Sequence, residues 1–156
     1  MNVGELPSLG CIFCEDIRHE VTGLSSFIGV MPGAIFLPSY PCQLAKFGIA
    51  ISWLFDKNEI PETLNVQLVV PWQAEPIKIQ QLDTRGLQFQ MKNEDDPDSI
   101  GAWTACRAVL SPFPVPSPGR IRAEVNTGSG WRIAGTLRFR EMVRPQEAAS
   151  PDLGGR

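Results

Sequence analysis

The chain has 156 residues, of which 43% are hydrophobic and 20% are charged, a composition typical of one folded globular domain and not of a disordered chain. A net charge of −3 gives no support to a nucleic-acid binder or to a protein that binds membrane surfaces. No run approaches the ~18 apolar residues of a membrane span, and the segment MNVGELPSLG has neither the basic nor the apolar region of a signal peptide. We therefore expect a cytoplasmic protein with reduced cysteines, no membrane partner and no nucleic-acid partner.

Glycine and proline, 14 of each, separate short apolar or alternating runs along the whole chain. This pattern is typical of an all-β protein. The proline-rich segment 111–119 is expected to be an extended connector. The sequence predicts a two-sheet antiparallel β-sandwich, immunoglobulin-like or C2-like, over residues 1–143, followed by a disordered tail at 144–156. We expect about eight strands, and nine runs are candidates for them: residues 11–21, 24–30, 47–55, 64–70, 77–82, 87–92, 102–110, 120–125 and 131–139.

The first predicted strand, residues 11–21, holds a Cys-x-x-Cys pair and the only histidine of the chain. Residues three apart on a strand lie on opposite faces, so this pair does not suit zinc or thiol redox chemistry, and we expect no metal and no cofactor. The apolar residues of the strand define its inward face, with Cys11, Phe13, Glu15, Ile17, His19 and Val21. The outward face then holds Ile12, Cys14, Asp16, Arg18 and Glu20.

The final hairpin concentrates positive charge. Residues 107–144 contain seven arginines and two acidic residues, whereas residues 1–106 contain six basic and 13 acidic ones. A register in which Val125 faces Trp131 places Trp131 and Ile133 inward with the other apolar residues. The same register places five arginines outward: Arg120, Arg122, Arg132, Arg138 and Arg140.

These features predict a binding module without catalytic activity, whose partner is another protein or a second copy of the chain. The arginine face would provide the contact, together with Trp72, which lies close to two prolines and is expected to be exposed. An alternative is a small-ligand or metal-binding module that uses Glu15, Asp16, Arg18 and Glu20, or the acidic loop Glu94–Asp98. A hydrolase that uses His19 is a third possibility, although no catalytic motif accompanies this residue.

The segment CEDIRHEVTGLSSFIGV, residues 14–30, resembles the opening of an uncharacterised family of small bacterial proteins. That family begins with a strand of the type Cys-Asp-Asp-Ile-Arg-x-Glu, then a glycine turn and a second strand that ends in Ile-Gly-Val. Leu24 departs from the pattern, where a lysine is expected. The resemblance implies a bacterial or phage-related origin and no catalytic residues. The matching residues here are Cys14, Asp16, Ile17, Arg18, Glu20, Gly23, Ile28, Gly29 and Val30.

Overall fold

The structure is a computed structural model that describes residues 8–56, 61–83 and 102–143. Within these ranges the chain forms twelve strands and no helix, so the prediction of an all-β protein is confirmed. The strands are β1 (Ser8–Cys14), β2 (Asp16–His19), β3 (Ser25–Ile28), β4 (Ala34–Leu37), β5 (Cys42–Leu44), β6 (Phe47–Phe55), β7 (Thr63–Val69), β8 (Ile77–Asp83), β9 (Ala102–Leu110), β10 (Phe113–Val115), β11 (Gly119–Asn126) and β12 (Trp131–Glu141).

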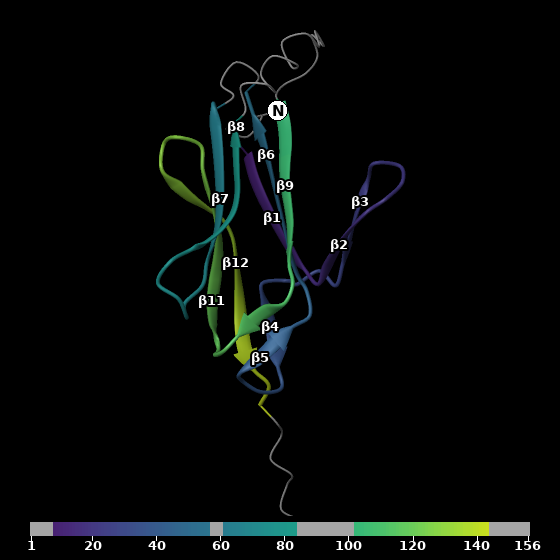
Figure 1. Ribbon diagram of the computed structural model, residues 1–156, viewed down its shortest axis with the longest axis vertical. Helices are drawn as coiled ribbons and strands as arrows, with labels where there is room; N and C mark the ends of the chain where they lie inside the picture. Colours follow the sequence, from purple (N-terminus) through teal and green to yellow (C-terminus); the bar gives the residue numbers. More distant parts are fainter. Residues whose placement is uncertain (1–7, 57–60, 84–101, 144–156) are drawn as a thin grey trace, which may run out of the picture.

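Two larger sheets pack on one hydrophobic core. Their strand orders are β1-β6-β9 and β4-β12-β11-β7-β8, and every pairing in them is antiparallel except that of β4 with β12. The long strands run along the long axis of the molecule, with β4 and β5 at one end and the β2–β3 hairpin to one side (Figure 1). The sheets approach closely at Gly135, where an added Cβ would lie 2.7 Å from Cβ of Cys11. The predicted sandwich architecture is therefore present.

Phe47, at the start of β6, is the centre of the core and is fully buried. Its ring stacks on Phe113 with centroids 4.5 Å apart and on Phe13 with centroids 5.9 Å apart. Phe113 belongs to the proline-rich segment, whose short strand β10 pairs with β5 in a separate two-stranded sheet. The segment is therefore extended, as predicted, and it contributes a core aromatic as well as a connection.

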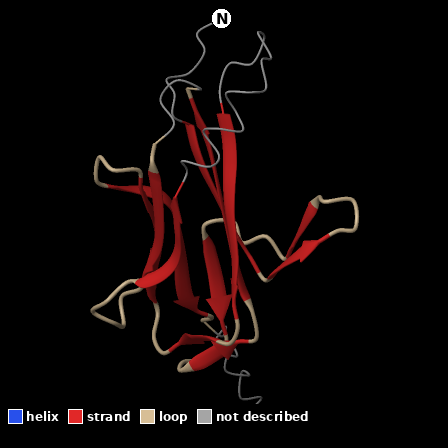
Figure 2. Cartoon of the chain, turned by 45° about the horizontal axis from the view of Figure 1, so that its top comes forward, coloured by secondary structure: helices blue, strands red, loops and turns tan. Residues whose placement is uncertain are grey.

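The predicted strand 11–21 is two strands that are separated at Glu15, and this overturns part of the expected face pattern. The backbone N–H of Glu15 donates to the carbonyls of Ile28 and Gly29, at 2.9 and 3.2 Å, instead of extending the pairing of β1 with β6. After this break β2 leaves the sandwich and pairs with β3 as a projecting hairpin (Figure 2). Cys14, expected outward, is consequently fully buried, whereas Glu15, His19 and Val21, expected inward, are exposed.

The final hairpin differs from its predicted register because of a β-bulge. Trp131 pairs with Asn126, which leaves a four-residue loop, and Ala134 is an extra residue between the pairs Glu124–Ile133 and Ala123–Gly135. An inserted residue reverses which positions face the core. Leu137 and Phe139 are buried as predicted, but Trp131 and Ile133 are 47% and 57% exposed, so their inward placement is wrong.

The remaining strand predictions fall into three groups. The strands predicted at 47–55 and 102–110 are confirmed with the same bounds, and those at 24–30, 64–70, 77–82, 120–125 and 131–139 are confirmed with shifted ends. The strand predicted at 87–92, the loop 94–98 and the tail 144–156 lie outside the described residues. Strands β4 and β5 were not predicted. No described segment forms a helix long and apolar enough to cross a membrane.

Candidate binding groove and arginine surface

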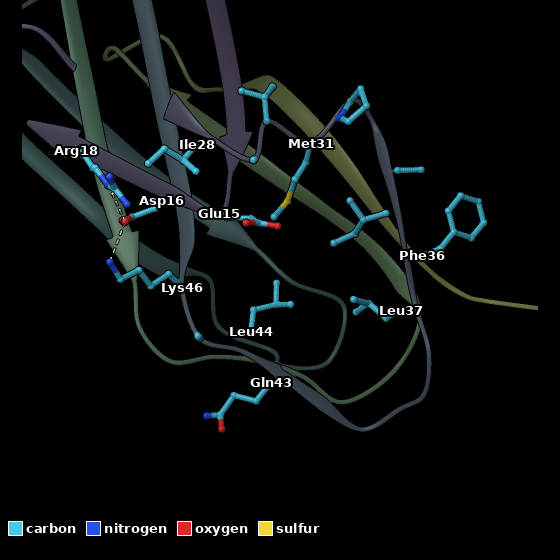
Figure 3. A pocket seen from close by; sticks show the side chains of 16 residues that line it. Glu15, Asp16, Arg18, Ile28, Met31, Phe36, Leu37, Gln43, Leu44 and Lys46 are labelled. Atoms are coloured by element: carbon cyan, nitrogen blue, oxygen red, sulfur yellow. Dashed lines mark hydrogen bonds and ion pairs between the residues drawn. The ribbon is translucent and has the colours of Figure 1, made fainter. Parts of the chain in front are cut away.

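A groove of about 940 Å³ lies between the β2–β3 hairpin, strand β4 and strand β5. One wall is charged and the rest is mainly apolar (Figure 3). The charged side chains are Glu15, Asp16, Arg18 and Lys46, and the apolar ones include Ile28, Met31, Leu37 and Leu44. Several residues of the segment 14–30 that the sequence singled out therefore meet at one concave surface, which we call the groove.

Asp16 is the centre of the charged wall. Its Oδ2 atom lies 2.9 Å from Nζ of Lys46 and 3.9 Å from Nε of Arg18, and its Oδ1 accepts a hydrogen bond from the backbone N–H of Ile17 at 3.0 Å. The hydrogen bond from Lys46 lowers the pKa of Asp16 more than any other interaction does. Asp16 and Arg18 were both among the candidate site residues of the sequence, whereas Lys46 was missed because it lies 30 positions from Asp16 in the chain.

Glu15 is exposed and directs its carboxylate toward the groove, beside Met31 (Figure 3). This carboxylate forms no hydrogen bond or ion pair with any other described residue. Space for it depends on Gly29, because a Cβ there would lie 2.6 Å from Cγ and Cδ of Glu15. Gly29 also has a φ of +63°, a conformation that L-residues seldom adopt. Glycine at position 29 therefore permits the left-handed backbone of the turn and leaves the space that the Glu15 side chain occupies.

One side of the groove is the free edge of β4. Among the strands that the structure describes, β4 ends its sheet and pairs with β12 alone, in parallel register. The N–H of Arg138 donates to the carbonyl of Gly33 at 3.0 Å, and the N–H of Met142 donates to that of Leu37 at 2.9 Å. Because backbone groups alternate along a strand, the N–H and C=O of Phe36 point away from β12, toward the open edge.

An arginine-rich surface lies on the outer face beside this edge. Arg120 is directly opposite Arg138 in the β11–β12 register, Arg138 is next to Ala34, and Arg140 is next to Phe36. The side chains of Arg120, Arg138 and Arg140 form no ion pair with any other residue in the described ranges. Phe36 is 54% exposed. We call these four residues the arginine surface.

Two of the five predicted arginines have other environments. Nε of Arg122 lies 3.1 Å from Oε1 of Glu124, a largely buried carboxylate that also accepts a hydrogen bond from Nε2 of Gln67 at 2.9 Å. Arg132 lies before the bulge and pairs with the buried Val125. It lines a small cavity beside Trp53, on the opposite side from the other arginines. The bulge thus explains why Arg132 does not share a face with the other four arginines, whereas Arg122 differs from Arg120 and Arg138 by its ion pair with Glu124.

Trp72 does not have the expected exposure. It is half-buried, and its ring lies 6.2 Å from that of Phe113 and 6.1 Å from that of Phe139. These contacts join it to the edge of the core.

The predicted acidic cluster is separated along the β2–β3 hairpin, with Glu15 and Asp16 in the groove and Glu20 outside it. Glu20 is near the far end of β2, where its Oε1 accepts a hydrogen bond from Oγ of Ser26 at 2.6 Å, and it does not line the groove. In the part of the chain that the structure describes, no three His, Cys, Asp or Glu residues are grouped so as to hold a metal ion. His19 is exposed and lies opposite Ser25, but no hydrogen bond joins their side chains.

The Cys-x-x-Cys pair consists of two free thiols. Burial raises the pKa of Cys11 to about 12 and also raises the pKa of Cys14. Both thiols are therefore protonated at neutral pH, and a protonated thiol is a poor nucleophile and a poor metal ligand. This environment favours the interpretation that they pack as small hydrophobic side chains.

Comparison of the chain with models of protein families, with curated proteins and with solved structures finds no match. The resemblance of residues 14–30 to a bacterial family therefore stays a prediction.

Proposed function

We propose that this chain is a protein-binding module that uses the groove and the arginine surface on the two sides of β4. The observation that carries the proposal is the set of three arginines, Arg120, Arg138 and Arg140, without acidic partners in the described ranges. Placing like charges directly opposite each other in a sheet is unfavourable. An acidic partner would relieve this repulsion and would also cover the exposed ring of Phe36.

The charge distribution supports a protein partner over a nucleic acid. A nucleic-acid site normally presents a broad basic surface, whereas here the three unpaired arginines lie on one side of β4 and the groove on the other side contains the acidic side chains Glu15 and Asp16. A surface that carries both charges next to apolar residues suits a protein segment with its own mixed pattern.

The environment of Asp16 supports binding over acid–base catalysis. A general acid or base works best with a pKa near the operating pH. The hydrogen bond from Lys46 instead lowers the pKa of Asp16, so the carboxylate stays ionised and holds the ion pair. The charged wall is therefore suited to fixing the shape of the groove.

Charge reversal on the arginine surface tests the proposal. The double variant Arg120→Glu/Arg138→Glu should lose the proteins that the tagged wild-type chain captures from cells. The matched control, Arg107→Glu/Arg132→Glu, makes the same change in net charge at two exposed arginines away from this surface. Equal capture by both variants would contradict the proposal, provided that thermal unfolding shows both to be folded.

The partner could also be a second copy of the chain, and light scattering after size-exclusion chromatography at 50 and 500 mM NaCl distinguishes this case. Association through charged surfaces weakens as salt screens them. A dimer at low salt that dissociates at high salt, and that is absent in Arg120→Glu/Arg138→Glu, would identify self-association.

A small-molecule ligand is the second candidate, favoured by the unpaired carboxylate of Glu15 beside an apolar lining in a groove of this size. Such a ligand would carry a cationic group. Thermal unfolding with arginine methyl ester and with spermidine tests this function, because a ligand that binds only the folded chain raises its melting temperature. The rise should disappear in Glu15→Gln, and no rise with any cationic probe would remove this candidate.

A further inference from the structure

We propose that the free edge of β4 receives an extended segment of the partner protein as an added strand, and that this segment alternates acidic and apolar side chains. The inference rests on the proposed function, since it takes the partner to be a protein. It adds the backbone conformation of the bound segment and the chemistry of its side chains.

The backbone of β4 is prepared for such an addition. The N–H and C=O of Phe36 point to the open edge, and neither has a partner among the described residues. The carbonyl of Ala34 has the same direction, because it is two positions away on the same strand. An extended peptide adds to an exposed sheet edge through these groups and gains its affinity from main-chain hydrogen bonds.

The two sides of β4 differ in chemistry, and this sets the pattern of the added strand. Ile35 and Leu37 pack toward the core and line the groove with Met31. Ala34 and Phe36, which border the same groove, have their side chains on the other face of the sheet, with Arg138 and Arg140. Side chains of an added strand alternate between the same two faces, at about 4.8 Å from β4. Residues on the groove side would therefore be apolar, and residues on the arginine side would be acidic.

The charge of the arginine surface favours a different protein over a second copy of this chain as the strand that pairs with the β4 edge. If two β4 edges paired antiparallel to continue one sheet, the arginine surfaces of both copies would lie side by side on the same face of that sheet. Like charges across such a junction repel each other. An acidic segment from another protein replaces this repulsion with attraction, so we assign the edge to a different chain.

Selection from a library of random octapeptides displayed on phage tests the proposal directly. The wild-type chain should enrich peptides in which Asp or Glu alternates with Leu, Ile, Val or Phe. Phe36→Pro removes the free N–H at the edge without removing a bond to β12, since proline is tolerated on edge strands in this orientation. Phe36→Ala is the matched control, because it removes the ring and keeps the N–H.

Binding of a selected peptide, measured by fluorescence anisotropy, should be at least about fivefold weaker for Phe36→Pro than for Phe36→Ala, as expected for a lost main-chain hydrogen bond. Loss of all enrichment, enrichment without alternation, or equal binding by the two variants would each overturn the strand addition. These outcomes are separate from the test of the proposed function. If Arg120→Glu/Arg138→Glu loses its captured partner while Phe36→Pro keeps it, the protein-binding function stands and the strand addition is wrong.

Discussion

Gly29→Ala should destabilise the chain through two separable effects, because Gly29 has both a left-handed backbone and a close neighbour. At a φ of +63° an L-residue costs about 1–2 kcal/mol. The new Cβ would also lie 2.6 Å from Cγ and Cδ of Glu15, and forcing that exposed side chain off its rotamer costs about 0.5–1.5 kcal/mol. The expected loss in the free energy of unfolding is therefore about 1.5–3.5 kcal/mol, or about 3–14 °C in melting temperature.

Urea denaturation in two backgrounds separates these effects. In a Glu15→Ala background the close contact is absent, so Gly29→Ala should cost only the backbone contribution, about 1–2 kcal/mol. Gly33→Ala is the matched control, because Gly33 has a φ of +78° but nothing within 4 Å of an added Cβ. Gly33→Ala should lower the free energy of unfolding by the same amount in both backgrounds. The reasoning is refuted if Gly29→Ala costs the same with and without the Glu15 side chain.

Three further predictions concern the core, a buried thiol and the groove. Phe47→Ala removes a fully buried ring that stacks on Phe113 at 4.5 Å, and it should lower the free energy of unfolding by about 3–5 kcal/mol in urea denaturation; a loss below 1 kcal/mol would contradict the packing. The pKa of Cys11 is raised from 9.0 to about 12, so the folded chain keeps a proton that the unfolded chain loses. The contribution of this thiol to the free energy of unfolding should therefore be fully present below pH 9 and be lost as the pH rises toward 12. Cys11→Ala should remove this part of the pH dependence of stability. Lys46→Ala should move the carboxyl titration midpoint of Asp16, followed by ¹³C NMR, upward toward its ordinary value, because the hydrogen bond from Lys46 is the main cause of the lowered pKa; an unchanged midpoint would mean that the ion pair does not form in solution.

Strands with long apolar or alternating runs were predictable from the sequence. The run FGIAISWLF predicts β6 with its observed bounds because it is apolar except for Gly48 and Ser52 and lies between the charged residues Lys46 and Asp56. β4 was missed, although AIFL lies between Gly33 and Pro38, a short apolar run with turn residues on both sides. Its pairing with β12 joins segments about a hundred residues apart, and no local pattern specifies such a partner.

The candidate site was predictable in part. The segment 14–30 was recognised as unusual, and Asp16 and Arg18 do line the groove. The face pattern failed wherever the backbone departs from an uninterrupted strand. After the break at Glu15, and again across the extra residue Ala134, the side chains expected to face the core are those that face solvent. The alternation of apolar and polar residues does not show where a residue is inserted or where a strand leaves its sheet.

The pairing of β4 with β12 also sets an order of events during synthesis. β4 is translated about a hundred residues before β12, and until then it has no sheet to join. At about 5–20 residues per second, this delay is of the order of 5–20 s on the ribosome. Arg138 and Arg140 arrive on the same late strand. A partner that recognises both the β4 edge and these arginines can therefore bind only chains translated through β12, and truncated products are excluded from the complex by geometry alone.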